Sequence, residues 1–581
     1  MNNASLELGG TNWAEKDASL LGYTVSDDSG RFSPQEFTFA RGSNLAATRI
    51  GKTGLIEKGR ENLLLQSNSF DTTWVKSSST VTSGQAGYDN SNDAWLLEKS
   101  GAYGRLDQTA SFSGVQTFSV YAKLTNPTEA NCLTLRVDIP NNIVQTTFNL
   151  ETQVVDDNNG FGSIIEQVGD DGWYRCSTTY IGNSIVARIY VALNGQTNLA
   201  TGSLLIQDAQ IEQGLAATPY IETTTTTAQA GVLENTPRLN YTTGVANPYL
   251  LLEPSRTNLV TNSEYMPSFS IGGDAIISLA NVINPQGTLS SYQVTSINNG
   301  SRIQQTIGPQ GNNFVYSGFF KGTGVATRLR IANNLGNEIR CDIGANGIFT
   351  IQSTTSTNYG IEDYGNGWHR IYFETTTSSA ANNFLQVYPD SNDGNGSIYV
   401  WGLQAEQGTY PTSYIPTYSV SATRAADSSE ILSIQSNGIV GATDSYTIFF
   451  DISNDDGGNA ADGGNSQWLK GQDSSYSNIW TLRKQDTADQ KYHSLYYNKD
   501  ADYVFSSETI NKGCFVFTTN EVKVFLDGSL NTTYSVANSP LNLNGILIDY
   551  GSSDRTTIKF SQLLLFPTAL SDADCITLTT I

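Results

Sequence analysis

The sequence contains one twelve-residue phrase twice: "QIEQGLAATPYI" at residues 210–221 and "QAEQGTYPTSYI" at residues 404–415, which is 194 residues later. Several landmarks repeated in the same order indicate a duplicated domain, whereas one shared phrase does not. "GRENLLLQSNSF" at 59–70 corresponds to "SRTNLVTNSEYM" at 255–266, "TFSVYAKL" at 117–124 to "VYSGFFKG" at 315–322, and "DGWYR" at 171–175 to "NGWHR" at 366–370. These offsets of 194 to 198 residues predict one fold used twice.

The alternation of side chains indicates the type of fold. In "TFSVYAKL", Phe118, Val120 and Ala122 alternate with Thr117 and Ser119, and a period of two is typical of a half-buried strand. Turn clusters such as "DDNNGFG" and "NDGNGS" separate the runs, and the chain is rich in Tyr and Gly but only 15% charged. We therefore predict an all-β protein of tandem antiparallel β-sandwiches, with each copy a jelly roll.

The last 150 residues do not repeat the module, yet short strand-like runs recur at regular spacing. The Asp-Gly pair of "VFLDG" at 524–528 is a strong hairpin signal. "FPTALSD" at 566–572 precedes what we expect to be a short closing helix. We predict a third sandwich here.

These observations divide the chain into five parts. Between the two copies, residues 221–256 carry a five-threonine run and three prolines, which favour an extended connector that docks locally and does not fold alone. The predicted parts are an N-terminal segment (1–60), module 1 (61–226), a connector (227–256), module 2 (257–427) and a C-terminal sandwich (428–581).

Charge and cysteine content exclude several classes of protein. A net charge of −23 disfavours nucleic acid as a partner. We expect no membrane insertion and no ordinary secretory leader, because long apolar runs and a basic start are lacking. The cysteines are odd in number and widely spaced, so we interpret them as packing residues; they are Cys132, Cys176, Cys341, Cys514 and Cys575.

Three stretches resemble structural proteins of tailed bacteriophages whose sandwich modules are similar to carbohydrate-binding domains. They are "FTFARGSNLAATRIGKTGLIEKGRENLLLQSNSFDTTW" at 37–74, "LLLEPSRTNLVTNSE" at 250–264 and "LQAEQGTYPTSYIPTYSVSATRAAD" at 403–427. The resemblance covers roughly residues 30 to 430. Residues 428–581 resemble the concanavalin-like or laminin-G-like lectin fold.

The resemblance implies a structural subunit on the exterior of a virion, a tail or head fibre. It implies attachment to other virion proteins through the N-terminus, display of the lectin-like domain to host-surface glycans, and a homo-oligomer, commonly a trimer. It implies no enzymatic activity. Two alternatives remain open, a secreted or cell-surface bacterial glycan-binding adhesin and a polysaccharide depolymerase.

Aromatic residues are the candidates for glycan binding, because sugar rings stack on exposed Trp and Tyr. In the C-terminal sandwich these candidates, with one amide, are Trp468, Trp480, Tyr496, Tyr497 and Asn498. We assign Trp173, Trp368 and Trp401 to the core or to sheet packing.

Catalytic and metal sites are weakly indicated. The chain has two histidines, of which His369 takes the place of Tyr174 in the other copy and is expected in a strand. No Glu-x-Asp-x-x-Glu string occurs in residues 428–581, so a paired-carboxylate glycosidase site is not expected. No cofactor is expected. The acidic loop with Asp451, Asp455, Asp456 and Asp462 is interpreted first as a solvated loop, and a calcium site with these oxygen ligands is the alternative.

Overall fold

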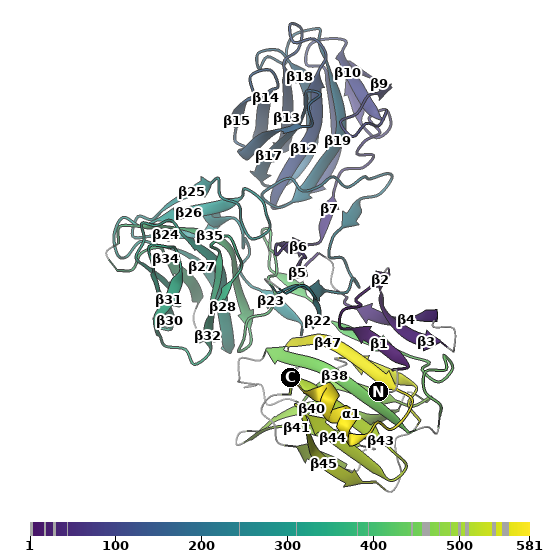
Figure 1. Ribbon diagram of the computed structural model, residues 1–581. Coiled ribbons are helices and arrows are strands. Elements are labelled where there is room, and N and C mark those ends of the chain that lie inside the picture. The colour runs from purple at the N-terminus through teal and green to yellow at the C-terminus, as the bar shows by residue number, and fades with distance from the viewer. Residues whose placement is uncertain are drawn as a thin grey trace.

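In the computed structural model the chain is an all-β protein, in which several antiparallel sheets pair as sandwiches and the described residues include one short α-helix. Three lobes surround a junction of short strands (Figure 1). The structure describes residues 4–16, 19–26, 31–42, 45–242, 245–308, 311–379, 382–392, 394–442, 445–455, 465–475, 477–487, 490–497, 501–505, 510–536, 542–548 and 557–580.

Module 1 consists of two six-stranded antiparallel sheets that enclose one apolar core. The first sheet has the order β16 (Phe161–Val168), β17 (Trp173–Ile181), β12 (Val115–Leu124), β19 (Ser203–Gln213), β10 (Ala94–Lys99), β9 (Ser79–Gln85). The second has the order β15 (Val154–Asn158), β14 (Asn142–Asn149), β13 (Cys132–Ile139), β18 (Ser184–Ala192), β11 (Arg105–Phe112), β8 (Val75–Ser77).

Module 2 repeats this plan and adds a single turn of 3₁₀ helix, η1 (Met266–Ser268). One sheet has the order β25 (Ile276–Ala280), β26 (Ser291–Thr295), β35 (Ser397–Gln407), β28 (Asn313–Gly322), β33 (His369–Thr376), β32 (Tyr359–Asp363). The other has the order β24 (Ser270–Gly272), β27 (Arg302–Gly308), β34 (Asn383–Tyr388), β29 (Arg328–Ala332), β30 (Glu338–Ile343), β31 (Phe349–Thr354). The predicted duplication is therefore one fold with the same strand order in both copies.

The predicted central strand exists, but it is more buried than a period of two suggests. Phe118, Val120 and Ala122 of β12 face the core, as expected. Thr117 and Ser119 on the opposite face are also buried. The reason is that the chain folds back over this face after β19, where the Gly214 carbonyl oxygen accepts a 3.0 Å hydrogen bond from the Thr117 hydroxyl.

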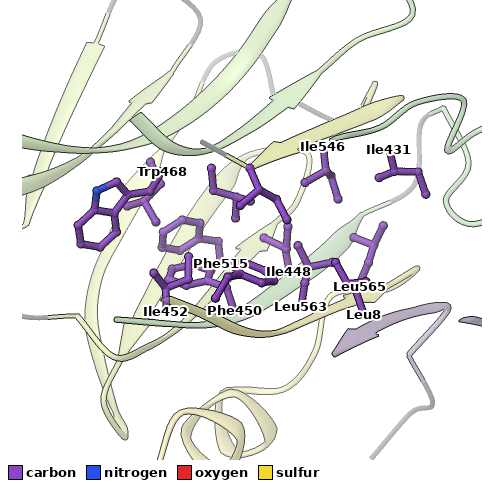
Figure 2. Packing of buried hydrophobic residues seen from close by; sticks show 14 of the residues in the cluster. Leu8, Ile431, Ile448, Phe450, Ile452, Trp468, Phe515, Ile546, Leu563 and Leu565 are labelled. Atoms are coloured by element: carbon purple, nitrogen blue, oxygen red, sulfur yellow. The ribbon is translucent and has the colours of Figure 1, made fainter. Parts of the chain in front are cut away.

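The C-terminal sandwich is completed by the N-terminal strands, which are β1 (Leu6–Gly9), β2 (Glu15–Lys16), β3 (Ser19–Ser26) and β4 (Arg31–Ala40). β1 pairs with β47 (Thr557–Phe566), and β4 pairs with β37 (Ser428–Ile431). Leu8 of β1 lies among the core side chains Ile448, Phe450 and Leu563 (Figure 2). Strands within the predicted N-terminal segment of residues 1–60 therefore contribute side chains to the same core as residues 428–581.

Antiparallel ladders connect the remaining strands of this sandwich. They are β38 (Tyr446–Asp455), β39 (Asn465–Gln472), β40 (Asn478–Thr487), β41 (Gln490–Tyr497), β42 (Ala501–Phe505), β43 (Lys512–Phe517), β44 (Glu521–Leu526), β45 (Ser529–Ser535) and β46 (Gly545–Ile548). One ladder runs β47–β38–β43–β44–β45 and the other runs β4–β37–β46–β39–β40–β41–β42.

Two local predictions in the C-terminal sandwich are confirmed. Asp527 and Gly528 both have positive φ, 44° and 83°, and form the tight turn between β44 and β45. The closing helix is α1 (Asp572–Thr579), whose N-cap Ser571 accepts a hydrogen bond from the Asp574 backbone N–H at 3.2 Å.

Short strand pairs form the junction of the three lobes. β7 (Arg60–Asn62) pairs with β20 (Ala228–Ala230) at the base of module 1, and β23 (Arg256–Asn258) pairs with β36 (Ala422–Arg424) at the base of module 2. Hairpin 1 consists of β5 (Thr48–Ile50) and β6 (Ile56–Lys58), and hairpin 2 of β21 (Leu239–Asn240) and β22 (Tyr249–Leu252). The connector of residues 227–256 therefore contains hairpin 2.

Each hairpin docks on a lobe other than the one it leads into. Hairpin 1 precedes module 1 in sequence but lies against module 2, where the Ile56 N–H donates to the Pro285 carbonyl oxygen at 2.9 Å. Hairpin 2 precedes module 2 but joins the C-terminal sandwich through β22 and β47. These crossed contacts hold all three lobes at one junction.

Candidate functional site

The repeated phrase forms the same buried polar cluster in both modules. In module 1, Gln210 and Thr218 both donate side-chain hydrogen bonds to Glu212, at 2.7 and 2.5 Å. In module 2, Gln404 and Thr412 donate to Glu406 at the same two distances. The sharp fold-back after each last strand leaves a carboxylate that must find donors when buried, and the phrase supplies them.

The fold-back is fixed at a second point by an asparagine. The Asn62 side-chain amide donates to the Ala209 and Ile221 carbonyl oxygens, at 3.1 and 2.8 Å. Asn258 does the same in module 2 with Leu403 and Ile415, at 3.3 and 2.9 Å. The repeated phrase therefore has an architectural role, because it fixes the fold-back after the last strand of each module.

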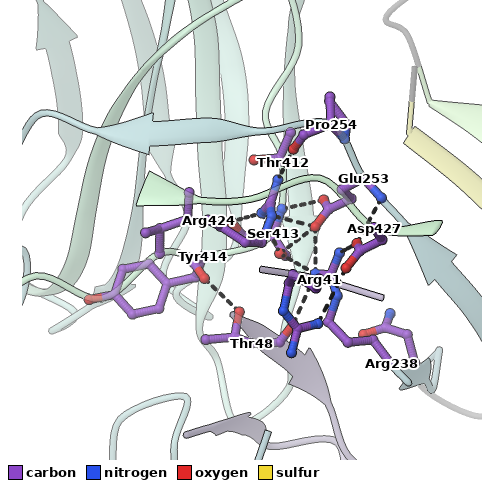
Figure 3. A network of polar contacts seen from close by, with 12 residues as sticks. Arg41, Thr48, Arg238, Glu253, Pro254, Thr412, Ser413, Tyr414, Arg424 and Asp427 are labelled. Atoms are coloured by element: carbon purple, nitrogen blue, oxygen red, sulfur yellow. Dashed lines mark hydrogen bonds and ion pairs between the residues drawn. The ribbon is translucent and has the colours of Figure 1, made fainter. Parts of the chain in front are cut away.

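A buried ion network lies between hairpin 2 and the segment that leaves module 2 (Figure 3). Arg238 bonds Glu253 at 2.6 Å and also contacts Asp427. Arg424 bonds Glu253 at 2.9 Å, and Arg41 bonds Asp427 at 3.3 Å. None of these five side chains has more than 2% of its surface exposed.

Neighbouring charges within the network shift the pKa values of its members. Burial alone would raise the pKa of Glu253, but attraction to Arg424 and Arg238 outweighs it and lowers the pKa to about 2. Burial lowers the pKa of Arg41 to about 10, although Asp427 opposes the shift. Charges that are paired this deeply hold segments in register, and removing one partner is costly.

A cleft opens beside this network, with a volume of about 290 Å³. Hairpins 1 and 2, the β32–β33 turn of module 2 and β47 enclose it. Tyr241, Tyr249 and Tyr364 supply aromatic surface, and Glu362 and Lys559 supply charge. The Asn240 amide donates to the Tyr249 hydroxyl at 2.6 Å, which fixes that ring at the rim.

The chemistry of the cleft is suited to a polar ligand with apolar faces. Tyrosine rings offer flat apolar surface together with a hydroxyl, and few rotatable bonds are frozen on binding. Carboxylate, amide and ammonium groups can bond hydroxyls of a bound sugar. The cleft could not be predicted from the sequence, because its lining comes from segments far apart in the chain.

The predicted glycan site in the C-terminal sandwich is not assembled as expected. Trp468 and Trp480 lie in the apolar core with 0% and 1% of their surface exposed, so neither ring offers a face to a ligand. Trp480 also donates to the Tyr446 hydroxyl at 2.9 Å. Tyr496 and Tyr497 lie on β41, but their side chains and Asn498 are outside the described residues.

The acidic loop remains a prediction. Asp451 lies on β38, where burial raises the pKa of its carboxyl group. The Asp455 side chain and both Asp456 and Asp462 are outside the described residues. Within the described ranges no group of three or more His, Cys, Asp and Glu side chains is arranged to hold a metal ion.

The residues assigned to packing are confirmed. Trp173 and Trp368 are each 1% exposed, Trp401 is 0% exposed, and His369 begins β33 as a buried residue. All five cysteines are buried and free of disulfides. Among the described residues there is no helix with the length and apolar character needed to cross a membrane.

Comparison with known proteins gives distant structural likenesses. No family model matches the sequence, and no curated protein matches it. The tandem CBM22 domains of Paenibacillus barcinonensis Xyn10C are 11% identical with a TM-score of 0.18, covering 63% of this chain and 98% of theirs. The Trypanosoma rangeli sialidase bound to the inhibitor DANA is 9% identical with a TM-score of 0.22, covering 99% of this chain and 98% of its own.

An exo-beta-1,3-galactanase from Phanerochaete chrysosporium is also similar, at 9% identity and a TM-score of 0.16, over 69% of this chain and 96% of its own. These are likenesses to β-sandwich carbohydrate-binding modules and to β-domains of glycoside hydrolases. At such TM-scores they say nothing of what this chain binds.

Proposed function

We propose that this chain is a non-catalytic structural subunit on the exterior of a bacteriophage virion, a fibre or appendage protein whose sandwiches bind surface glycans. One observation carries the proposal. The stretches that resemble phage appendage proteins are the ones that build the junction: residues 37–74, 250–264 and 403–427 supply Arg41, Glu253 and Arg424 of the ion network.

The geometry supports a structural role because contacts at the junction join the three lobes. Hairpin 1 ties module 2 to the start of module 1, and hairpin 2 ties the C-terminal sandwich to the start of module 2. A rigid, acidic, multi-lobed subunit is suited to display on a particle, and we propose a homotrimer as its assembled form. Light scattering of the purified chain tests the trimer.

The glycan-binding part of the proposal rests on the cleft at the junction. Its test is binding of the full chain to polysaccharide from the host surface, with wild type compared to Tyr249→Ala. Removing one stacking ring should weaken binding by about 1–3 kcal/mol if the cleft is the site, by analogy with other aromatic stacking on planar ligands. Tyr103→Ala, which removes an exposed ring of module 1, is the matched control.

The virion part is tested by immunogold electron microscopy with antibody to residues 428–581 on purified particles. Gold at the tail tip or around the head supports the proposal and tells the two locations apart. Unlabelled particles, together with export of the chain without phage lysis, would instead favour a bacterial adhesin. Deleting residues 1–60 is an unsuitable test of attachment, because it removes four strands from the C-terminal sandwich.

A further inference from the structure

The outer face of one module 2 sheet concentrates positive charge in a chain whose net charge is −23. On β27, β34, β29 and β30 the residues Ile303, Val387, Ile331 and Ile339 point into the core. The alternate positions therefore face outward. They carry four arginines (Arg302, Arg328, Arg330 and Arg340) against two carboxylates (Glu338 and Asp342).

The guanidinium groups on this face are held in place. Arg330 and Arg340 each donate through Nε to Glu338, at 2.6 and 2.7 Å. The Arg330 guanidinium also lies 4.5 Å from the centre of the Tyr388 ring, and that of Arg302 lies 5.7 Å from it on the same row. Because the bonds to Glu338 use Nε, the Nη groups of Arg330 and Arg340 make no hydrogen bond with any residue that the structure describes.

On the equivalent face of module 1 the arginines are paired with carboxylates. There Arg105 lies 5.6 Å from the Tyr190 ring, as Arg302 does over Tyr388. However, Asp107 accepts from Arg105 and from Arg188, each at 2.9 Å, so the charges are satisfied internally. The ladder continues through Asp138, which pairs with both Arg188 and Arg136.

Module 2 replaces the central ion pair of this ladder with amides. Gln304 and Gln386 face each other in register where module 1 has Asp107 and Arg188. The Gln386 amide donates to the Gln304 side-chain oxygen at 3.0 Å. Module 2 therefore presents one oriented amide, Gln304, and incompletely paired arginines, which is a suitable surface for an anion that also carries hydroxyl groups.

We propose that the outer face of β27, β34, β29 and β30 binds an acidic polysaccharide. The anionic groups of the polymer bond the Nη groups of Arg330 and Arg340, and sugar hydroxyls bond Gln304, which the buried Gln386 holds in place. This inference deepens the proposed glycan-binding function and rests on it. The site is distinct from the cleft, which lies at the junction.

The test is binding of the full-length chain to sodium polygalacturonate, to its fully methyl-esterified neutral form, to dextran sulfate and to dextran. We expect binding to an acidic polymer that weakens as salt rises. The double variant R330Q/R340Q should lose about tenfold or more in affinity, since each lost bond is charge-assisted. Preference for polygalacturonate identifies a carboxylate as the anion, and preference for dextran sulfate identifies a sulfate ester; both outcomes support the proposal.

Two matched controls separate the site from general charge. K52Q/K523Q removes the same number of positive charges from exposed or partly exposed positions elsewhere and should leave the affinity unchanged. R105Q/R136Q on module 1 should have a smaller effect than R330Q/R340Q, because those arginines are paired internally. Hydrogen exchange of β29 and β30 checks that the variants remain folded.

Equal binding to the acidic and esterified polymers, an unchanged affinity in R330Q/R340Q, or an equal loss in K52Q/K523Q would each overturn the inference. If the chain binds host or neutral glycans and no acidic polymer, this inference fails while the proposed function stands. If it binds no glycan at all, both fail.

Discussion

Modules 1 and 2 share a fold, a strand order and a buried polar cluster, but they differ in what covers the aromatic patch on the first sheet. In module 1, Tyr88 from the module's own β9–β10 loop stacks on Tyr121, with ring centres 4.0 Å apart. In module 2, Ile56 of hairpin 1 packs with Phe319 and Trp368 at the equivalent place. The patch can thus be closed either from within the module or by a segment from outside.

The two modules agree in the contacts that each must make within itself and differ at the surfaces that other segments cover. The fold-back clusters of Glu212 and Glu406 agree bond for bond, because each must satisfy a buried carboxylate within its own module. The surfaces that meet neighbours have diverged. Asp208 on the bulge of β19 has φ 54°, and Gly402 at the same point of β35 has φ 60°, so one backbone shape carries a charge in one module and no side chain in the other.

The largest expected effect comes from the two connector hairpins, which carry the same Arg–Glu pair in different surroundings. Arg238→Ala leaves Glu253 and Asp427 short of a buried partner and should lower the free energy of unfolding by about 3–5 kcal/mol. Arg49→Ala breaks the equivalent 2.9 Å bond to Glu57, which is partly exposed, and should change it by no more than about 1 kcal/mol. Calorimetry of the two variants of the full chain measures both values.

Equal losses in the two variants would contradict this contrast. Such a result would mean that the deep burial of the Arg238 network adds nothing to its contribution to the free energy of unfolding.

The next effect depends on pH and on the difference between Asp208 and Gly402. Burial raises the pKa of the Asp208 carboxyl to about 7, with the Tyr88 hydrogen bond opposing and the neighbouring Asp93 and Asp89 adding to the rise. The folded chain therefore holds this proton more tightly than the unfolded chain does. The resulting stability is fully present below about pH 4 and is lost as pH rises through about 7.

Asp208→Asn keeps the hydrogen-bond acceptor and removes the titration. The variant should be more stable than wild type at pH 8, by an amount on the order of a few kcal/mol, and the two should converge near pH 4. Unfolding midpoints measured between pH 4 and 8 test this. A difference that is constant across that range would show that Asp208 does not titrate as the structure implies.

The third effect concerns Ile56 and Tyr88, the residues that pack on the aromatic patch of each module. Ile56→Ala opens a cavity beside Phe319 and Trp401 and should cost about 2–5 kcal/mol, near the lower end because the residue lies on a short hairpin. Hydrogen exchange of residues 48–58 should speed up. Lys52→Ala at the exposed hairpin turn is the control, and Tyr88→Ala should affect module 1 while leaving hairpin 1 protected.

If Ile56→Ala leaves the exchange of hairpin 1 unchanged, then the backbone bond from Ile56 to Pro285 holds the hairpin without the side chain.

The smallest effect tests the part that the modules share. Thr218→Val and Thr412→Val each remove one hydroxyl that donates to a buried carboxylate at 2.5 Å. Each should cost about 1.5–3 kcal/mol, and the two costs should be similar. Denaturant unfolding of both single variants provides the comparison; a large loss in one module alone would show that the matching geometry hides a difference in energy.

The repeated and local features could be predicted from the sequence. Landmark spacing predicted the duplication, and Asp-Gly at 527–528 predicted its hairpin, because both signals lie within a few residues of the structure they specify. The alternation of side chains along a strand could have placed Trp480 in the core, since Leu482 lies two residues further along β40 and both are buried. Trp480 was instead predicted to bind glycan because it is aromatic.

The junction could not be predicted, because its contacts join segments that are distant in sequence. Arg41 meets Asp427 across 386 positions, and the cleft is lined by several segments that are far apart in the chain. Both connectors carry an Arg followed by a Glu, which are Arg49 and Glu57 at hairpin 1 and Arg238 and Glu253 at hairpin 2. Nothing in their spacing showed that hairpin 1 would dock on module 2 and hairpin 2 on the C-terminal sandwich.

The pairing of β1 with β47 also determines the order in which the lobes can fold during synthesis. Leu6 leaves the ribosome well before its partner Leu565 has been added. At about 5–20 residues per second, the N-terminal strands wait roughly half a minute to two minutes with their edges unpaired. Modules 1 and 2 can form during that interval, so the third lobe closes last, and an incomplete chain would be released with an exposed strand edge that quality control can recognise.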